Sequence, residues 1–114
     1  MQHPTKRMKK DLLKDVAGRK VVIDRLADDL KNQIASKAQH IREANVDNPA
    51  IPQWQEEMKR LQNRFVTEPE TATYSLCDEI QRKTGFTEVN KRNTEATNRG
   101  LKGEAWAKYV LEME

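Results

Sequence analysis

The stretch that decides the fold is DLLKDVAGRKVVIDRLADDLKNQIASKAQHI, residues 11–41. Its apolar residues recur every three or four positions, with a mean period of about 3.6, which is typical of one face of an α-helix. Such a helix is about 45 Å long at 1.5 Å per residue. Gly18 within it costs roughly 1 kcal/mol relative to alanine and indicates a bend, a break or a close helix contact. The apolar residues are Leu12, Val16, Ile23, Leu26, Leu30, Ile34, Ala38 and Ile41.

A helix break follows at residues 45–52, NVDNPAIP. This segment contains two prolines and an Asp-Asn-Pro turn sequence, which together exclude a continuous helix. We predict a second helix over residues 52–66, about 22 Å long. It should fold back antiparallel on the first helix because the connection is short. Its apolar residues are spaced as a narrow a/d seam, and they are Trp54, Met58, Leu61 and Phe65.

A third helix is predicted over residues 69–84. Thr67 and Glu70 have the spacing of a capping box, with Pro69 near the helix start. Gly85 suits the position that follows the end of a helix. Residues 87–103 leave two alternatives, a helix with a stripe of small side chains or a flexible linker. A short amphipathic helix is expected from about Gly103.

These segments predict an all-α protein, a long helical hairpin extended to a three- or four-helix bundle. We divide the chain into a flexible basic tail at residues 1–7, the hairpin plus third helix at 8–85, and a polar segment with a C-terminal amphipathic helix at 86–114. Hydrophobic residues make up 36% of the chain and charged residues 34%, so the core must be thin. The single cysteine and the lack of a 20-residue apolar run predict a soluble cytoplasmic protein.

No set of residues converges on a reaction mechanism. His40 has no cysteine or second histidine at metal-ligand spacing. Asp24 and Asp28 each have a basic residue close by, as on an ordinary solvated helix surface. Cys77 is followed by two acidic residues, which would disfavour its reactive thiolate. We therefore predict a non-enzymatic protein with no cofactor, no metal and no small-molecule substrate.

The unequal predicted lengths of the first two helices point to protein–protein contacts. A helix of about 22 Å leaves part of a stripe of about 45 Å uncovered, so another segment, a partner protein or a second subunit must cover it. We predict an adaptor, inhibitor or assembly subunit, with a homo-oligomer expected. Such a small, polar chain would suit a viral or mobile-element accessory protein. The candidate partner anchor, which alternatively completes the protein's own core, is Trp106, Tyr109, Val110 and Met113.

Nucleic-acid binding is the second hypothesis. Residues 1–20 carry seven basic residues against two acidic ones, and such a segment attracts phosphates. Residues 76–94 loosely resemble a helix-turn-helix motif around Gly85, with Thr87 as a possible cap and Asn93 on the second helix. Three positions do not fit, because Gln81, Lys91 and Thr94 stand where the motif needs small or apolar side chains. The candidate nucleic-acid contacts are Lys6, Arg7, Lys9, Lys10, Lys91, Arg92 and Arg99.

Overall fold

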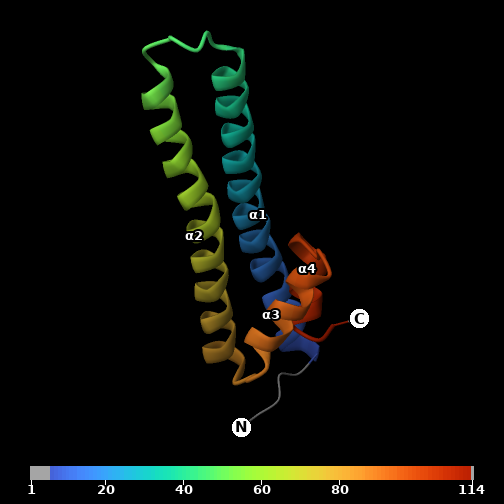
Figure 1. The fold of residues 1–114 in the computed structure, drawn as a ribbon. Helices are drawn as coiled ribbons and strands as arrows, with labels where there is room; N and C mark the ends of the chain where they lie inside the picture. Colours follow the sequence, from blue (N-terminus) through green and yellow to red (C-terminus); the bar gives the residue numbers. More distant parts are fainter. Residues whose placement is uncertain (1–5, 114) are drawn as a thin grey trace. The chain divides into compact units, whose positions relative to one another are not determined.

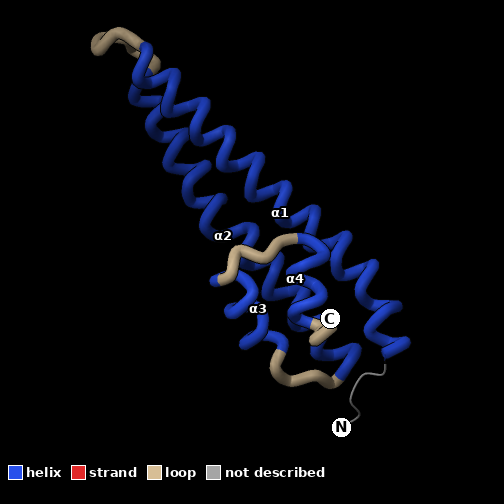
Figure 2. Tube along the Cα trace, turned by 90° about the vertical axis from the view of Figure 1, so that its right-hand side faces the viewer, coloured by secondary structure: helices blue, strands red, loops and turns tan. Residues whose placement is uncertain are grey.

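The computed structural model describes residues 6–113, with side chains from residue 9 onward. The regular elements of this range are the helices α1 (Lys6–Glu43), α2 (Ile51–Thr84), α3 (Val89–Asn98) and α4 (Gly103–Val110) (Figure 1). Loops and turns connect them (Figure 2). The predicted all-α fold, a helical hairpin extended by further helices, is confirmed. The expected basic tail lies mostly outside the described residues.

The chain divides into two compact units. Unit 1 comprises Met1–Asp24 and Thr71–Glu114, and unit 2 comprises Arg25–Glu70. Helices α1 and α2 contribute a segment to each unit, whereas α3 and α4 belong to unit 1. Unit 1 therefore packs segments that lie far apart in the sequence, and unit 2 packs two segments joined by one loop.

In unit 2, α1 and α2 run side by side in opposite directions on either side of the connecting loop (Figure 1). Asn48 organises this loop. Its backbone N–H donates to the carbonyl of Asn45 at 2.9 Å, and its side-chain oxygen accepts from the N–H of Ala50 at 2.9 Å. Because the Asn48 side chain and backbone satisfy polar groups before Ile51, α2 can begin there. The predicted break and antiparallel return are confirmed.

The predicted boundary between a second and a third helix is wrong. α2 is continuous from Ile51 to Thr84 and contains Pro69. The Thr67 hydroxyl is no cap, because it donates to the carbonyl of Asn63 at 2.9 Å, one turn back in the same helix. A proline inside a helix costs about 3 kcal/mol. Apolar packing of α2 before the proline in unit 2, and after it in unit 1, outweighs this cost.

The expected mismatch in helix length is also wrong, because α2 has 34 residues against 38 in α1. α1 is continuous through Gly18, where an added Cβ would meet open space. The glycine therefore marks neither a break nor a close helix contact. With two arms of similar length, any surface left for a partner has to be identified from the exposure of individual side chains.

Residues 87–103 match neither of the two predicted alternatives completely. Residues 89–98 form α3, which then ends in a Schellman motif. The N–H of Leu101 donates to the carbonyl of Ala96, and the N–H of Gly100 donates to that of Thr97, both at 3.0 Å. Gly100 has φ +74°, a conformation that glycine adopts without steric cost. The small-residue stripe is therefore split between α3 and α4.

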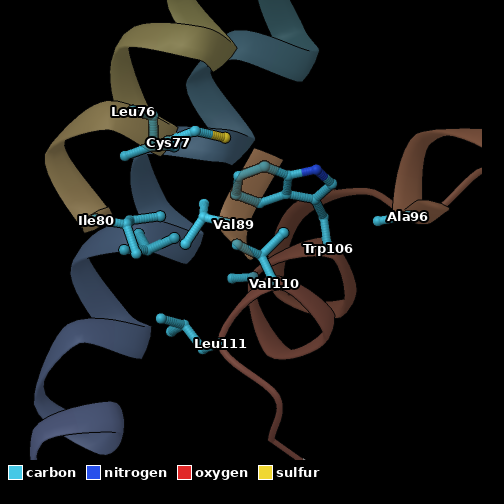
Figure 3. Close-up of a cluster of buried hydrophobic side chains, with 10 residues drawn as sticks. Leu76, Cys77, Ile80, Val89, Ala96, Trp106, Val110 and Leu111 are labelled. Atoms are coloured by element: carbon cyan, nitrogen blue, oxygen red, sulfur yellow. The ribbon is translucent and has the colours of Figure 1, made fainter. Parts of the chain in front are cut away.

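The core of unit 1 is built from segments of all four helices. Figure 3 shows Cys77 of α2, Val89 of α3 and Trp106 and Val110 of α4 pointing toward one another. Gly85, at φ +71°, follows the end of α2 as predicted. The buried apolar members of this core are Val16, Leu76, Cys77, Ile80, Val89, Ala96, Trp106, Ala107, Val110 and Leu111.

Candidate interaction surface

The predicted C-terminal anchor belongs to the core of unit 1. Trp106 and Val110 have no exposed surface. The indole Nε1–H of Trp106 donates to Oδ1 of Asn93 at 2.9 Å, so its polar edge is also satisfied inside the unit. Tyr109 and Met113 are half-buried against the same core. Trp106 and Val110 therefore do not fit the anchor prediction, because both side chains are buried in the core of unit 1 and leave no surface for a partner.

A polar network in unit 1 fixes the start of α4. The Asp24 carboxylate of α1 accepts a hydrogen bond from the N–H of Gly103 at 2.8 Å. It also forms an ion pair with Lys20 at 2.7 Å. The buried Lys20 ammonium also lies 5.2 Å from the centroid of the Trp106 ring. A Cβ on Gly103 would approach Val21 to 3.2 Å, so the close approach favours glycine. Asp24 is thus a helix cap rather than the solvated surface residue that the sequence predicted.

The apolar seam of unit 2 remains open to solvent. Within residues 25–70, Leu30 is the one fully buried apolar side chain, at 1% exposure. The other apolar residues of the two predicted stripes in this unit include Ile34, Trp54, Met58 and Leu61, and these are only half-buried. Two helices leave both edges of their shared seam accessible because no third helix covers them. The most exposed apolar side chains of α2 in unit 2 are Phe65, a member of the predicted seam, at 37% and its neighbour Val66 at 63%.

An open groove lies on unit 2 between its two helical segments, and we call it the unit 2 groove. α1 lines it with Gln33, Ser36, Lys37 and His40. α2 lines it with Glu57, Arg60, Leu61 and Arg64. Each set spans two turns of one helix face, at relative positions 0, 3, 4 and 7. No local sequence pattern identifies this site, because only the register of the hairpin brings the two faces together.

The unit 2 groove is electropositive. Lys37 donates to Glu57 across the hairpin at 2.7 Å. This hydrogen bond, with further attraction from Arg60, lowers the pKa of Glu57 and keeps it ionised. Arg64 is held by Glu68 one turn along α2, at 3.0 Å. The lining carries three basic side chains against one carboxylate, and Glu68 just outside it neutralises much of the charge on Arg64, so the remaining positive charge is centred on Arg60.

Of the residues predicted to contact nucleic acid, the structure describes the side chains of Lys9, Lys10, Lys91, Arg92 and Arg99. The side chains of Lys6 and Arg7 lie outside the described part of the chain. Lys10 and Lys91 are exposed, and Lys9 is half-buried. Arg92 is engaged within unit 1, where its Nε donates to the carbonyl of Tyr109 at 2.7 Å.

Three further positions bear on the nucleic-acid hypothesis, two of them within the segment that resembles a helix-turn-helix. The guanidinium of Arg99 lies 5.1 Å from the centroid of the Tyr109 ring. Asn93, expected on the reading face of the second helix, is buried against Trp106. α3 begins at Val89 without a side-chain cap, so Thr87 does not fill the capping position. Asn93 therefore cannot contact a base edge in this arrangement.

Cys77 is the remaining candidate for chemistry. Its side chain is fully buried, and this burial, with the nearby Asp78, raises the pKa of the thiol to about 11. A thiol protonated at neutral pH is a poor nucleophile. Within residues 6–113, no three His, Cys, Asp or Glu side chains are grouped as metal ligands. None of the helices in this range has the length and apolar character to cross a membrane.

Comparisons with protein-family models, with characterised proteins and with solved structures find no match to this chain.

Proposed function

We propose that this chain is a non-enzymatic interaction protein, an adaptor, inhibitor or assembly subunit, that docks through the open apolar seam of unit 2. The observation that carries the proposal is the contrast in burial between the two units. Among the side chains that the structure describes, unit 1 buries ten apolar ones in its own core, whereas unit 2 buries Leu30 alone. Burying apolar surface contributes about 25 cal/mol per Å², so a partner that covers this seam gains stability.

Matched double variants test this surface. Phe65→Gln with Val66→Gln removes exposed apolar surface from unit 2. Val22→Gln with Tyr74→Gln is the control, because these residues of unit 1 have similar exposures of 64% and 45%. Light scattering after gel filtration measures self-association, and affinity capture from native lysate measures partner binding.

We expect the original chain to be a dimer or larger, or to capture a partner, and the unit 2 variant to lose most of that association. The unit 1 control should retain it. A monomer that captures nothing would contradict the proposal, as would an equal loss in both variants or turnover of a substrate by the purified chain.

Nucleic-acid binding stays a prediction. It requires an affinity for DNA or RNA that falls steeply between roughly 50 and 200 mM salt, because binding releases counterions from the phosphates. Replacing Lys6, Arg7, Lys9 and Lys10 by alanine should then weaken binding without changing helicity. No affinity at low salt removes this alternative.

A further inference from the structure

We propose that the unit 2 groove binds an acidic amphipathic helix of a partner protein. This inference rests on the proposed function and names the chemistry of its partner. It follows from the spacing of the lining residues, the excess of positive charge and the apolar residue in the lining.

The spacing of the lining fits a helix. Positions 0, 3, 4 and 7 on each wall cover two helical turns, about 10 Å along the axis. A partner helix laid between the walls presents its own side chains at the same spacing. Leu61, half-buried in the lining, supplies apolar contact for a leucine or alanine of that helix.

The charge of the lining selects acidic residues. Arg60 and Arg64 are one turn apart on α2, so they match two carboxylates one turn apart on a partner helix. Lys37 on the α1 wall is paired with Glu57 across the groove, so its positive charge is largely neutralised. Carboxylates on the partner therefore gain most opposite Arg60, whereas a carboxylate opposite Arg64 shares that guanidinium with Glu68. Electrostatic complementarity of this kind sets specificity and association rate.

Two other occupants fit the groove less well. Glu57 repels the phosphates of a nucleic acid, whereas a helix can place a neutral residue opposite it. A second copy of unit 2 carries seven basic residues along with its eight acidic ones. Its basic side chains would therefore be repelled by the arginines of the groove. A separate acidic helix avoids both conflicts.

The direct test titrates the isotope-labelled full chain with a synthetic helical peptide and follows amide chemical shifts by NMR. The peptide carries leucine and alanine on one stripe and glutamate elsewhere, and a control peptide replaces each glutamate by lysine. We expect shifts over residues 33–40 and 57–64 with the acidic peptide, weakening as salt is added. Equal binding of the basic peptide, no binding, or shifts confined to other residues overturns the proposal.

Charge-reversal variants identify the residues responsible. Arg60→Glu with Arg64→Glu should weaken binding of the acidic peptide by about tenfold or more, because two attractions become repulsions. Lys31→Glu with Lys59→Glu changes the net charge equally at exposed positions outside the groove and should have little effect. Equal losses in the two variants overturn the proposal.

A variant that binds the acidic peptide more tightly cannot be explained by a failure to fold. Glu57→Gln removes the one carboxylate from the lining and releases Lys37, so it should raise the affinity for the acidic peptide a few-fold. Glu56→Gln, its exposed neighbour, should leave the affinity unchanged. Unchanged or lower affinity in Glu57→Gln overturns the proposal.

Other outcomes separate the two proposals. If the Phe65 and Val66 variant abolishes association while the acidic peptide does not bind the groove, the proposed interaction protein is supported and the proposed acidic partner is wrong. If a homodimer buries the groove, or duplex DNA displaces the peptide from it at physiological salt, the occupant proposed here is wrong.

Discussion

Units 1 and 2 share two helices but use them differently. In unit 1, α3 and α4 cover the segments of α1 and α2, so Trp106 and its neighbours have no exposed surface. In unit 2, the same two helices have only each other, and Leu30 is the one apolar side chain that they bury completely. The comparison shows that an amphipathic stripe does not fix burial by itself. Burial depends on how many elements reach the stripe.

The largest expected effect comes from the two tryptophans. Trp106→Ala should lower the free energy of unfolding by about 3–5 kcal/mol, because it leaves a cavity in unit 1 and removes one of the hydrogen bonds of the buried Asn93 side chain. Trp54→Ala should cost only about 1–2 kcal/mol, because that side chain is half-buried in unit 2. Urea denaturation followed by circular dichroism measures both. Similar losses in the two variants would contradict the difference in packing.

The next effect concerns the cap of α4. Asp24→Ala should cost about 2–4 kcal/mol, because it leaves the buried Lys20 without its carboxylate and the N–H of Gly103 without its acceptor. Hydrogen exchange at Gly103 and Trp106 should accelerate. Asp28→Ala, at an exposed position of unit 2, should change stability by about 0.5 kcal/mol or less. Unchanged stability in the Asp24→Ala variant would show that this polar network does not stabilise unit 1.

A smaller effect, of opposite sign, comes from the helix-breaking residues within the long helices. Pro69→Ala, near the end of unit 2, should raise stability by up to about 3 kcal/mol, because it restores a backbone donor to α2. Gly18→Ala, in unit 1, should raise it by about 0.5–1 kcal/mol, since the added Cβ meets open space. Thermal and urea unfolding compare the pair. Loss of stability in Pro69→Ala would mean that the proline's geometry is needed there.

The smallest effect is a pH dependence in unit 1. Hydrogen bonds from Lys83 and Arg19 lower the pKa of Glu79 from 4.5 to about 2. Its contribution to stability is therefore complete above pH 4.5 and is lost as the pH falls through 4.5 toward 2. The original chain should exceed Glu79→Gln in stability at neutral pH, and the difference should shrink over that range. Unfolding midpoints between pH 2 and 7 measure it, and a constant difference would exclude this linkage.

Much of the fold follows from local patterns. Three local signals each act within one helix or turn, and the structure agrees with all three. They are the period of residues 11–41, the helix break within residues 45–52 and the glycine after Thr84. The capping box at Thr67 and Glu70 failed because it was also a local pattern, and here tertiary packing outweighed it.

The candidate site was much harder to predict. Lys37 and Arg60 are unremarkable surface residues in the sequence, and they line one groove only because the hairpin register sets the two helix faces opposite each other. Trp106 looked suited to a partner because its large apolar surface shows in the sequence, whereas the neighbours that cover it do not.

The sequence by itself determined that the chain is helical, where the hairpin turns and which faces are apolar, because periodicity and turn chemistry act over a few residues. The tertiary structure decided which of those faces is enclosed. It placed Asp24 of α1 at the start of α4, 79 residues along the chain, and gave unit 1 a core while leaving the seam of unit 2 open. Enclosure depends on contacts between distant segments, and no local pattern specifies them.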